Sequence, residues 1–250
     1  MTILITGGTR GIGYAIAKHL AKKGETLFLV YHSDGATASK AKTVLTSQGA
    51  EVHLIQADVG SKLDCQRVMD EIKEESGQLD HIVHSAAMIY PTGLLDADLD
   101  KFTNAIETNG LSLLYLVQMA QPLLRRGSSI VFISSLGSRV APPGLGYAAL
   151  GAGKALAETI ILYLVPELAP LGIRINTVAP GITGTQSVAT MLGSKENADA
   201  ALARSAKANP SGRNTEGSDY TSLVEFLLQP EAEFIQGQVI AATGGMGLIR

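Results

Sequence analysis

The chain has 250 residues, of which 46% are hydrophobic and 17% charged, and its net charge is −3; this predicts one globular domain over residues 1–250 and excludes a strongly basic surface for nucleic acid. Its single cysteine, Cys65, excludes an intrachain disulfide, and we expect no membrane-spanning run. A first strand expected at Thr2 leaves no room for a signal peptide, so we expect a cytoplasmic protein that binds neither nucleic acid nor membrane.

Strand-like and helix-like segments alternate along the chain. Five segments have helical periodicity. They are Ile12–Ala21, the segment from the end of the second strand to about Gln48, about Lys62–Ser76, about Lys101–Arg125, and the segment from the end of the fifth strand to about Leu168. This alternation predicts an α/β fold, a doubly wound parallel sheet of about seven strands with helices on both faces. Short apolar runs predict the strands at Thr2–Thr6, Thr26–Tyr31, Glu51–Gln56, His81–Ala86, Ser129–Ser134, Ile173–Val178 and Gln238–Ala242.

One segment interrupts the alternation. Residues 181–214 are rich in Gly, Ser, Thr, Ala and Asn and show weak periodicity. They follow a strand end, where open α/β sheets bind ligands. We interpret this segment as a mobile substrate lid, and the alternative is a surface insertion without a role.

The first strand runs into a glycine-rich turn, "TGGTRGIG" at Thr6–Gly13. Glycine lets a backbone turn tightly and approach a pyrophosphate without a Cβ clash. The helix that follows offers free N–H groups and a positive dipole to the phosphates. At a strand–turn–helix junction, this pattern predicts a dinucleotide site. Its spacing, with Gly7, Gly11 and Gly13, is G-x-x-x-G-x-G.

This turn resembles the T-G-x-x-x-G-x-G signature of the short-chain dehydrogenase/reductase family, and the similarity extends over essentially the whole chain. It is carried also by "ADV" at Asp58, by Asn109, by "INTVAPG" at Ile175–Gly181 and by "GQVIAATGG". The resemblance implies a Rossmann-type fold. It implies the cofactor-binding residues Gly7, Thr9, Arg10, Gly11, Ile12, Gly13, Tyr31, His32, Ser33, Asp58, Val59, Ser85, Ala86, Ala87, Lys154, Pro180, Gly181, Ile182 and Thr185.

The end of the second strand indicates which nicotinamide cofactor is used. Members of this fold that select NAD usually carry an acid there, which binds the ribose hydroxyls. Here Tyr31, His32 and Ser33 carry no negative charge, and Asp34 lies too late in the chain. Arg10 can place a positive charge beside a 2′-phosphate. We therefore expect NADPH/NADP⁺ rather than NAD.

The helix after the fifth strand carries a candidate catalytic pair. Tyr147 and Lys154 are close to two helical turns apart, so their side chains are expected to share a face. The commonest family motif has tyrosine four residues before lysine, where this chain has Leu150. The longer Tyr-x6-Lys spacing resembles the enoyl-acyl-carrier-protein reductases of the family. The replacement of Asn-Asn-Ala-Gly by "HSAA" at His84–Ala87 agrees with that resemblance.

The chemistry explains why these residue types are needed. Hydride transfer leaves negative charge on a substrate oxygen, which needs a preorganised donor. Tyr147 can donate its phenol O–H, whose unperturbed pKa is about 10, and a nearby Lys154 ammonium is expected to lower that pKa. By the resemblance, Lys154 also holds the nicotinamide ribose hydroxyls. A ketone and an enoyl thioester need the same donor, so the motif leaves both reactions open.

Further polar residues are candidates for supporting roles. By the resemblance, Ser135 or its neighbour Ser134 orients the substrate, and the alternative is hydrogen bonding at a strand end. The distance from Ser135 to Tyr147 is close to the spacing in ketone reductases. Asn109 either supports a proton-relay water or bonds backbone at a helix kink. Tyr90 is a reserve donor or a packing aromatic.

The sequence leaves three functions open and favours the first. That is NADPH-dependent reduction of a 2-enoyl thioester, carried on acyl carrier protein or coenzyme A. The second is a carbonyl reductase, including 3-ketoacyl-thioester reduction, or an alcohol dehydrogenase. The third is an NADP(H)-binding protein without turnover. The histidines and Cys65 lack metal-ligand spacing, so we expect no metal. Family members are usually dimers or tetramers, and the apolar breadth of Ala155–Leu168 agrees with a homodimer or homotetramer.

Overall fold

The computed structural model describes residues 1–141 and 146–248, and its centre is one seven-stranded sheet. The strand order is β3-β2-β1-β4-β5-β6-β7, and every neighbouring pair is parallel. The sheet predicted from the sequence is therefore confirmed. The strands are β1 (Thr2–Thr6), β2 (Thr26–Tyr31), β3 (Glu51–Gln56), β4 (His81–His84), β5 (Ser129–Ile133), β6 (Arg174–Pro180) and β7 (Val239–Ala242).

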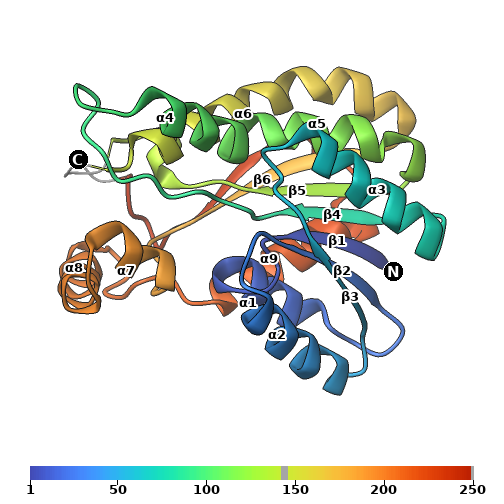
Figure 1. Ribbon diagram of the computed structural model, residues 1–250, viewed down its shortest axis with the longest axis horizontal. Helices are drawn as coiled ribbons and strands as arrows, with labels where there is room; N and C mark the ends of the chain where they lie inside the picture. The colour runs from blue at the N-terminus through green and yellow to red at the C-terminus, as the bar shows by residue number, and fades with distance from the viewer. Residues whose placement is uncertain (142–145, 249–250) are drawn as a thin grey trace.

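Helices cover both faces of the sheet (Figure 1). The helices α3, α4, α5 and α6 lie on one face, and α1, α2 and α9 lie on the other. The helices are α1 (Gly11–Leu20), α2 (Gly35–Ser47), α3 (Lys62–Ser76), α4 (Leu99–Ile106), α5 (Ser112–Ala120), α6 (Ala148–Leu168), α7 (Gln186–Leu192), α8 (Lys195–Ala208) and α9 (Ser218–Leu228), with short turns η1 (Glu107–Leu111), η2 (Gln121–Leu123), η3 (Leu136–Ser138), η4 (Ala169–Leu171) and η5 (Pro230–Ala232).

The central strands are buried on both faces because each face packs against its own layer of helices. In β1, Leu4 joins the core on the α3, α5 and α6 side, whereas Ile3 and Ile5 join the core on the α1 and α9 side. All five residues of β1 and of β5 are buried. A strand in this position needs apolar side chains at consecutive positions, which explains the continuous runs in the sequence.

The strand order reverses direction between β1 and β4. From β1 the chain winds outward through β2 to β3, and then returns to place β4 on the other side of β1. The loops after β1 and β4 therefore leave the sheet on opposite faces, and a crevice forms between them at the carboxyl ends of the strands. Both the glycine-rich turn and the "HSAA" loop belong to this edge.

The local structure adds detail to the sequence expectations. The segment 181–214, expected to be a mobile substrate lid with weak periodicity, contains α7 and α8, which project beyond the strand ends in Figure 1. The long helical region expected over about Lys101–Arg125 is present as α4, η1, α5 and η2, and η1 is a π-helical turn within it. The helix α9 was not predicted. Several boundaries also shift by one or two residues, and the strand expected at His81–Ala86 ends at His84.

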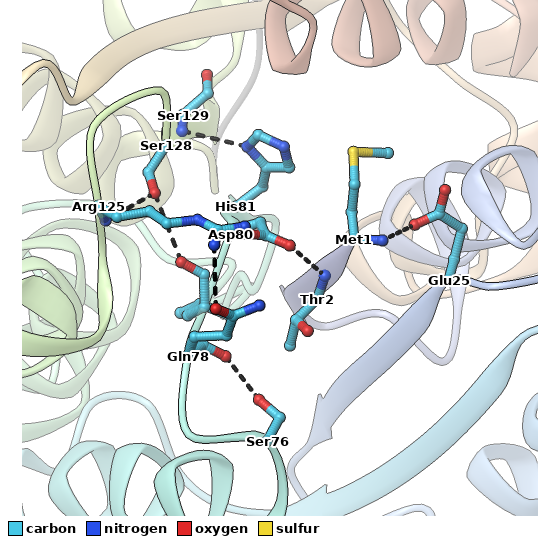
Figure 2. A network of polar contacts seen from close by, with 11 residues as sticks. Met1, Thr2, Glu25, Ser76, Gln78, Asp80, His81, Arg125, Ser128 and Ser129 are labelled. Atoms are coloured by element: carbon cyan, nitrogen blue, oxygen red, sulfur yellow. Dashed lines mark hydrogen bonds and ion pairs between the residues drawn. The ribbon is translucent and has the colours of Figure 1, made fainter.

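The opposite edge of the sheet, where β1 and β4 begin, is tied together by polar contacts (Figure 2). Asp80 accepts the Thr2 N–H at 2.8 Å and pairs with Arg125. The imidazole of His81 accepts the Ser129 N–H through Nδ1 at 3.2 Å. Because Nδ1 is an acceptor in this contact, His81 is held as a neutral imidazole.

We expect His81 to make the fold sensitive to acid. Burial lowers the pKa of His81 to about 4, against 6.5 for the free side chain. The unfolded chain therefore binds the extra proton more readily. The contribution of His81 to the free energy of unfolding is fully present above pH 6.5 and is lost as pH falls toward 4. Between pH 7 and pH 5 this loss is about 2 kcal/mol.

Urea unfolding at pH 7 and pH 5 measures this loss. We expect His81→Gln to lose about 2 kcal/mol less than the wild type over that interval. The matched change at the exposed His32, His32→Gln, is expected to keep the wild-type pH dependence. An unchanged pH dependence in His81→Gln would contradict the assignment.

One helix passes a length-and-composition test for membrane spans, which the sequence analysis did not expect. It is α6 with η4, Ala148–Leu171, and within residues 1–141 and 146–248 no other helix passes. In the apolar 18-residue stretch of this segment, 44% of the residues are buried inside the fold. Core helices of soluble proteins pass the same test, so this is weak support for a membrane span.

Candidate active site

The glycine-rich turn connects β1 to the amino end of α1, and its glycines let neighbouring backbone segments pack closely. Gly7 has φ +64°, and a Cβ there would lie 3.0 Å from Ala86 Cα. A Cβ on Gly13 would lie 2.3 Å from the Gly7 carbonyl oxygen. The first turn of α1 contains no acid, and the Arg10 side chain does not cap it. These features fit a pyrophosphate at the helix amino end.

Other residues of the predicted cofactor set surround this turn. Gly11 has φ +56°, and a Cβ there would lie 3.7 Å from Thr185, the residue before α7. Thr9 is buried beneath the turn, and Ile12 packs on the core below α1. Pro180 ends β6, while Gly181 donates its N–H to the Ala242 carbonyl at 3.0 Å and Ile182 is exposed.

The end of β2 carries the predicted selectivity residues. Tyr31 is the last residue of β2, and the exposed His32 and Ser33 follow it. Asp34, the nearest acid, caps α2, and its carboxylate accepts the N–H and the hydroxyl of Thr37 at 3.0 and 2.7 Å. These bonds lower the pKa of Asp34, and the charge of Arg10 lowers it further. Asp34 therefore serves as a helix cap and has the Arg10 charge nearby.

At the next strand end, the predicted adenine contact is held by local bonds. Asp58 Oδ1 accepts the Gly60 N–H at 2.9 Å, and the Asp58 N–H donates to Asp64 at 2.7 Å. Val59 is buried, and its carbonyl accepts the Cys65 thiol at 3.2 Å. Cys65 is thereby a packing residue at the base of this loop.

The "HSAA" loop is attached to β1 through Thr6, whose carbonyl accepts the Ser85 N–H at 3.3 Å. Thr6 Oγ1 accepts the N–H groups of Ser85 and Ala86, both at 3.1 Å, and contacts His84 Nδ1 at 2.6 Å. On its other side His84 Nε2 lies 2.8 Å from Ser112 Oγ. Ser112 donates its own proton to the Thr108 carbonyl at 2.7 Å, so it accepts from His84. These partners assign the Nε2–H tautomer to a neutral His84.

The same loop meets α6 and η1. Lys154 donates to the Ala86 carbonyl at 3.3 Å, while Asn109 exchanges two bonds of 2.9 Å with the backbone of Met88. Ala87, between these contacts, is exposed. Asn109 is therefore a loop anchor in the π-helical turn, which corresponds to the backbone-bonding alternative drawn from the sequence.

Lys154 is held in an apolar pocket behind this loop. It is 3% exposed, and its Nζ lies 4.5 Å from the centre of the Phe132 ring. Burial lowers the pKa of Lys154 to about 7, and the carboxylate of Glu158 acts in the opposite direction. Such a lysine titrates near neutral pH, so its ammonium charge depends on its neighbours.

Two glycines, Gly153 in α6 and Gly110 in η1, allow this approach. A Cβ on Gly153 would lie 2.6 Å from the Asn109 Cβ, and one on Gly110 would lie 2.7 Å from the Gly153 carbonyl oxygen. The helix and the π-helical turn therefore cross with their backbones almost in contact. The small residues between Tyr147 and Lys154 have this packing role.

Tyr147 lies immediately before the first residue of α6, as its N-cap. Its phenol oxygen lies 2.5 Å from Ser135 Oγ, which also accepts the Gly137 N–H at 3.3 Å. The structure thus brings Tyr147 and Ser135 together. Ser134, the alternative serine, instead donates to Glu158 at 2.5 Å. Tyr90 accepts the Asp98 N–H at 3.0 Å and so braces the loop before α4.

The expected effect of Lys154 on Tyr147 was wrong. Burial raises the pKa of Tyr147, and the Ser135 hydrogen bond only partly opposes that rise. Burial and the Ser135 hydroxyl account for this shift, and the Lys154 charge is not among its causes. Tyr147 therefore remains a protonated donor at neutral pH.

The Tyr147 ring packs directly on Gly137. A Cβ on Gly137 would lie 2.0 Å from Tyr147 Cε1, so Gly137→Ala must displace the ring. We expect kcat to fall about 10- to 100-fold, as small misplacements of reacting groups do, with unchanged NADPH affinity. Gly93→Ala is the control, because a Cβ on Gly93 meets no atom within 4 Å among the described residues. Steady-state kinetics and cofactor fluorescence measure both effects, and a wild-type kcat for Gly137→Ala would contradict this packing.

The sequence analysis missed three residues of this site. Glu158 accepts bonds from the turn after β5, Phe132 lies under Lys154, and His84 fills the space between β1 and α5. The only available signal was position: Glu158 is one helical turn after Lys154. Side chains that come together from separate segments of the chain cannot be identified from the spacing of residues in the sequence.

Comparisons with known proteins agree with this geometry. A family model described as enoyl-(acyl carrier protein) reductase matches residues 7–247. The 1-cyclohexenylcarbonyl-CoA reductase of Streptomyces collinus is 30% identical over 98% of this chain and 86% of its own. A short-chain dehydrogenase of Burkholderia cenocepacia in complex with NADP has TM-score 0.86 and 29% identity, over 97% and 96% of the two chains. The angucycline C-6 ketoreductase LanV with bound NADP has TM-score 0.87 and 26% identity, over 99% and 95%.

Proposed function

The chain belongs to the short-chain dehydrogenase/reductase family, and from this membership we propose that it uses NADPH to reduce the carbon–carbon double bond of a 2-enoyl thioester. The acyl group is carried on coenzyme A or on acyl carrier protein. The family model is described as an enoyl reductase, and the Streptomyces collinus relative is named for a cyclohexenylcarbonyl thioester.

NADPH is the cofactor that fits the crevice. The turn leads into an amino end of α1 whose first turn holds no acid, which suits the pyrophosphate, and Arg10, whose charge acts on Asp34 after β2, offers a guanidinium for a 2′-phosphate. Asp34, the acid that would oppose that phosphate, is bonded to Thr37. The related structures from Burkholderia cenocepacia and of LanV both contain NADP.

The observation that carries the choice of reaction is the state of Tyr147. Its phenol is bonded to Ser135 at 2.5 Å, and burial raises its pKa above the ordinary value. A weaker acid transfers its proton less readily, but it still donates a hydrogen bond. Reduction of an enoyl thioester needs only this bond, because the new proton goes to carbon and not to the oxygen.

Each residue then has a distinct task. When bound, NADPH would supply a hydride to the β-carbon, so that negative charge would develop on the thioester oxygen as an enolate. Tyr147 donates its O–H to that oxygen while Ser135 holds the phenol in place. The α-carbon takes a proton derived from solvent, which completes the saturated thioester. Lys154 holds the ribose hydroxyls with its ammonium group, and the Ala86 carbonyl orients that group.

The second candidate is reduction of a carbonyl, and the Ser135–Tyr147 contact favours it. In a ketone reductase the serine and the tyrosine both bond the carbonyl oxygen, and tyrosine must transfer its proton to the alkoxide. The neighbour LanV is named a ketoreductase. The same pair of hydroxyls therefore supports either reaction, and the acidity of Tyr147 distinguishes them.

Initial rates of NADPH oxidation test the proposal. Matched trans-2-enoyl and 3-ketoacyl thioesters of coenzyme A and of acyl carrier protein are offered separately, with NADH as the cofactor control. We expect turnover of the enoyl substrate with NADPH. Turnover of only the keto substrate would replace the first candidate by the second.

We also propose a homo-oligomer that buries the outer side of α6. Leu162 and Tyr163 are 61% and 73% exposed there, and family members are usually oligomeric. Sedimentation equilibrium is expected to show a dimer or tetramer, with a lower mass for Leu162→Glu. A monomeric wild type would contradict this.

A further inference from the structure

Glu158 lies at the junction of three parts of the site, although the proposed reaction assigns it no role. It follows Lys154 by one turn of α6, and its side chain is 10% exposed. Its Oε1 accepts the hydroxyls of Ser134 and Ser138 at 2.5 and 2.7 Å. Its Oε2 accepts the Arg139 Nε–H at 3.0 Å. Three donors on one carboxylate make a strong, charge-assisted anchor.

This anchor determines where the turn after β5 lies. Ser134 and Ser138 enclose the turn η3, and Ser135, between them, carries the hydroxyl bonded to Tyr147. Ser138 also contacts the Ser135 carbonyl at 2.8 Å. Both ends of the turn are therefore attached to α6 through Glu158, and the Ser135 hydroxyl is placed relative to that helix.

The same carboxylate acts on the buried lysine. The other groups that face Lys154 are the neutral His84 from β4, the Phe132 ring from β5 and the Ala86 carbonyl from the loop after β4. None of these carries a negative charge. Within the described residues, Glu158 is the carboxylate that favours the charged form of Lys154.

We propose that Glu158 is a positioning residue for this active site: its carboxylate fixes the Ser134–Ser138 turn against α6 and places a negative charge one helical turn from Lys154. It touches neither substrate nor cofactor, and it acts through Ser135 on Tyr147 and through its charge on Lys154. The role in turnover rests on the proposed function, whereas the effect on Lys154 does not.

The variant Glu158→Gln separates the two effects, because the amide oxygen still accepts the serine hydroxyls while the charge is lost. Wild-type NADPH affinity is expected to weaken as pH rises through the pKa of Lys154, since the neutral amine holds the cofactor less well. In Glu158→Gln the weakening is expected at lower pH. The ratio of variant to wild-type Kd should be about 10 at pH 7.5 and below about 3 at pH 5.5, as a shift of about one pKa unit gives.

Isothermal titration with NADPH from pH 5.5 to 8.5 makes this measurement without any acyl substrate. Glu167→Gln is the matched control, because Glu167 lies on the same helix and is exposed; it should follow the wild-type curve. A Glu158→Gln curve that superimposes on the wild type would overturn the proposal. If neither thioester is turned over, the proposed function fails while this binding curve still decides the role of Glu158.

A second variant tests the effect on the turn. Ser138→Ala removes one hydrogen bond to Glu158, so kcat is expected to fall about 3- to 10-fold, as loss of one hydrogen bond does. The variant keeps the Glu158 charge, so NADPH binding is expected to keep its wild-type pH dependence. If Glu158→Gln does not fold, Ser138→Ala decides the proposal, and a wild-type kcat would overturn it.

Discussion

We expect Tyr147→Phe to lower kcat by about 100-fold or more, which is the usual effect of removing a preorganised donor to a developing oxyanion. The phenol is 2.5 Å from Ser135 and is half-buried, so water cannot easily replace it. The substituted ring keeps its packing on Gly137, because only the hydroxyl is lost. The NADPH Kd and the melting temperature should therefore stay at wild-type values, and steady-state kinetics with the enoyl thioester measures the loss.

Two further Tyr→Phe variants show whether that loss is specific to Tyr147. Tyr14→Phe makes the same change in α1, on the other face of the sheet from α6, and is expected to have no effect on kcat. Tyr90→Phe tests the reserve donor, which the structure places in a loop contact with Asp98. An active Tyr147→Phe with an inactive Tyr90→Phe would move the donor role to Tyr90 and would contradict the site described above.

The second large effect is expected for Lys154→Met, which should inactivate the protein while making it more stable. The lysine is 3% exposed, and burial lowers its pKa to about 7 from 10.5. The unfolded chain binds the proton more tightly, so the buried ammonium costs stability below pH 10.5, of order 4 kcal/mol at pH 7. Methionine removes that cost, whereas the loss of the ribose contact should lower kcat/KM by about 100-fold.

Urea unfolding and NADPH titration of the same preparation measure both effects. Lys18→Met, at an exposed position of α1, is the control for the change in composition and should alter neither quantity. A Lys154→Met protein that is less stable than the wild type would show that the ammonium contributes net stabilising contacts. Full NADPH affinity in that variant would remove Lys154 from the cofactor site.

The fold was predictable because its strands are buried on both faces. Such strands must be continuous apolar runs, and β1 (Thr2–Thr6) and β2 (Thr26–Tyr31) are buried in this way and have the predicted bounds. The helix α8 was not predictable in the same way. Ala198 is its only buried residue with an apolar side chain among those the structure describes, so the sequence has no apolar stripe that reveals a helix.

Individual residues of the site could be predicted from the sequence, but the contacts between them could not. The positions of Tyr147, Ser135 and Lys154 could be identified from motif spacing, and the structure brings Tyr147 and Ser135 within 2.5 Å. The spacing could not show that α6 begins one residue after Tyr147, which makes Tyr147 the N-cap of the helix. Nor could it show Glu158 bonded to Ser134, because that contact joins β5 to the middle of α6.

The most direct test of the central claim is a competition with labelled cofactor. An equimolar mixture of a trans-2-enoyl and a 3-ketoacyl thioester of the same chain length is reduced with NADPH that carries deuterium at the transferred position. Mass spectrometry then reports the ratio of the two kcat/KM values as the ratio of labelled products. The weakly acidic, Ser135-bound phenol predicts label chiefly in the saturated thioester, by about tenfold or more. Label chiefly in the 3-hydroxyacyl thioester would contradict the account and would make this protein a carbonyl reductase.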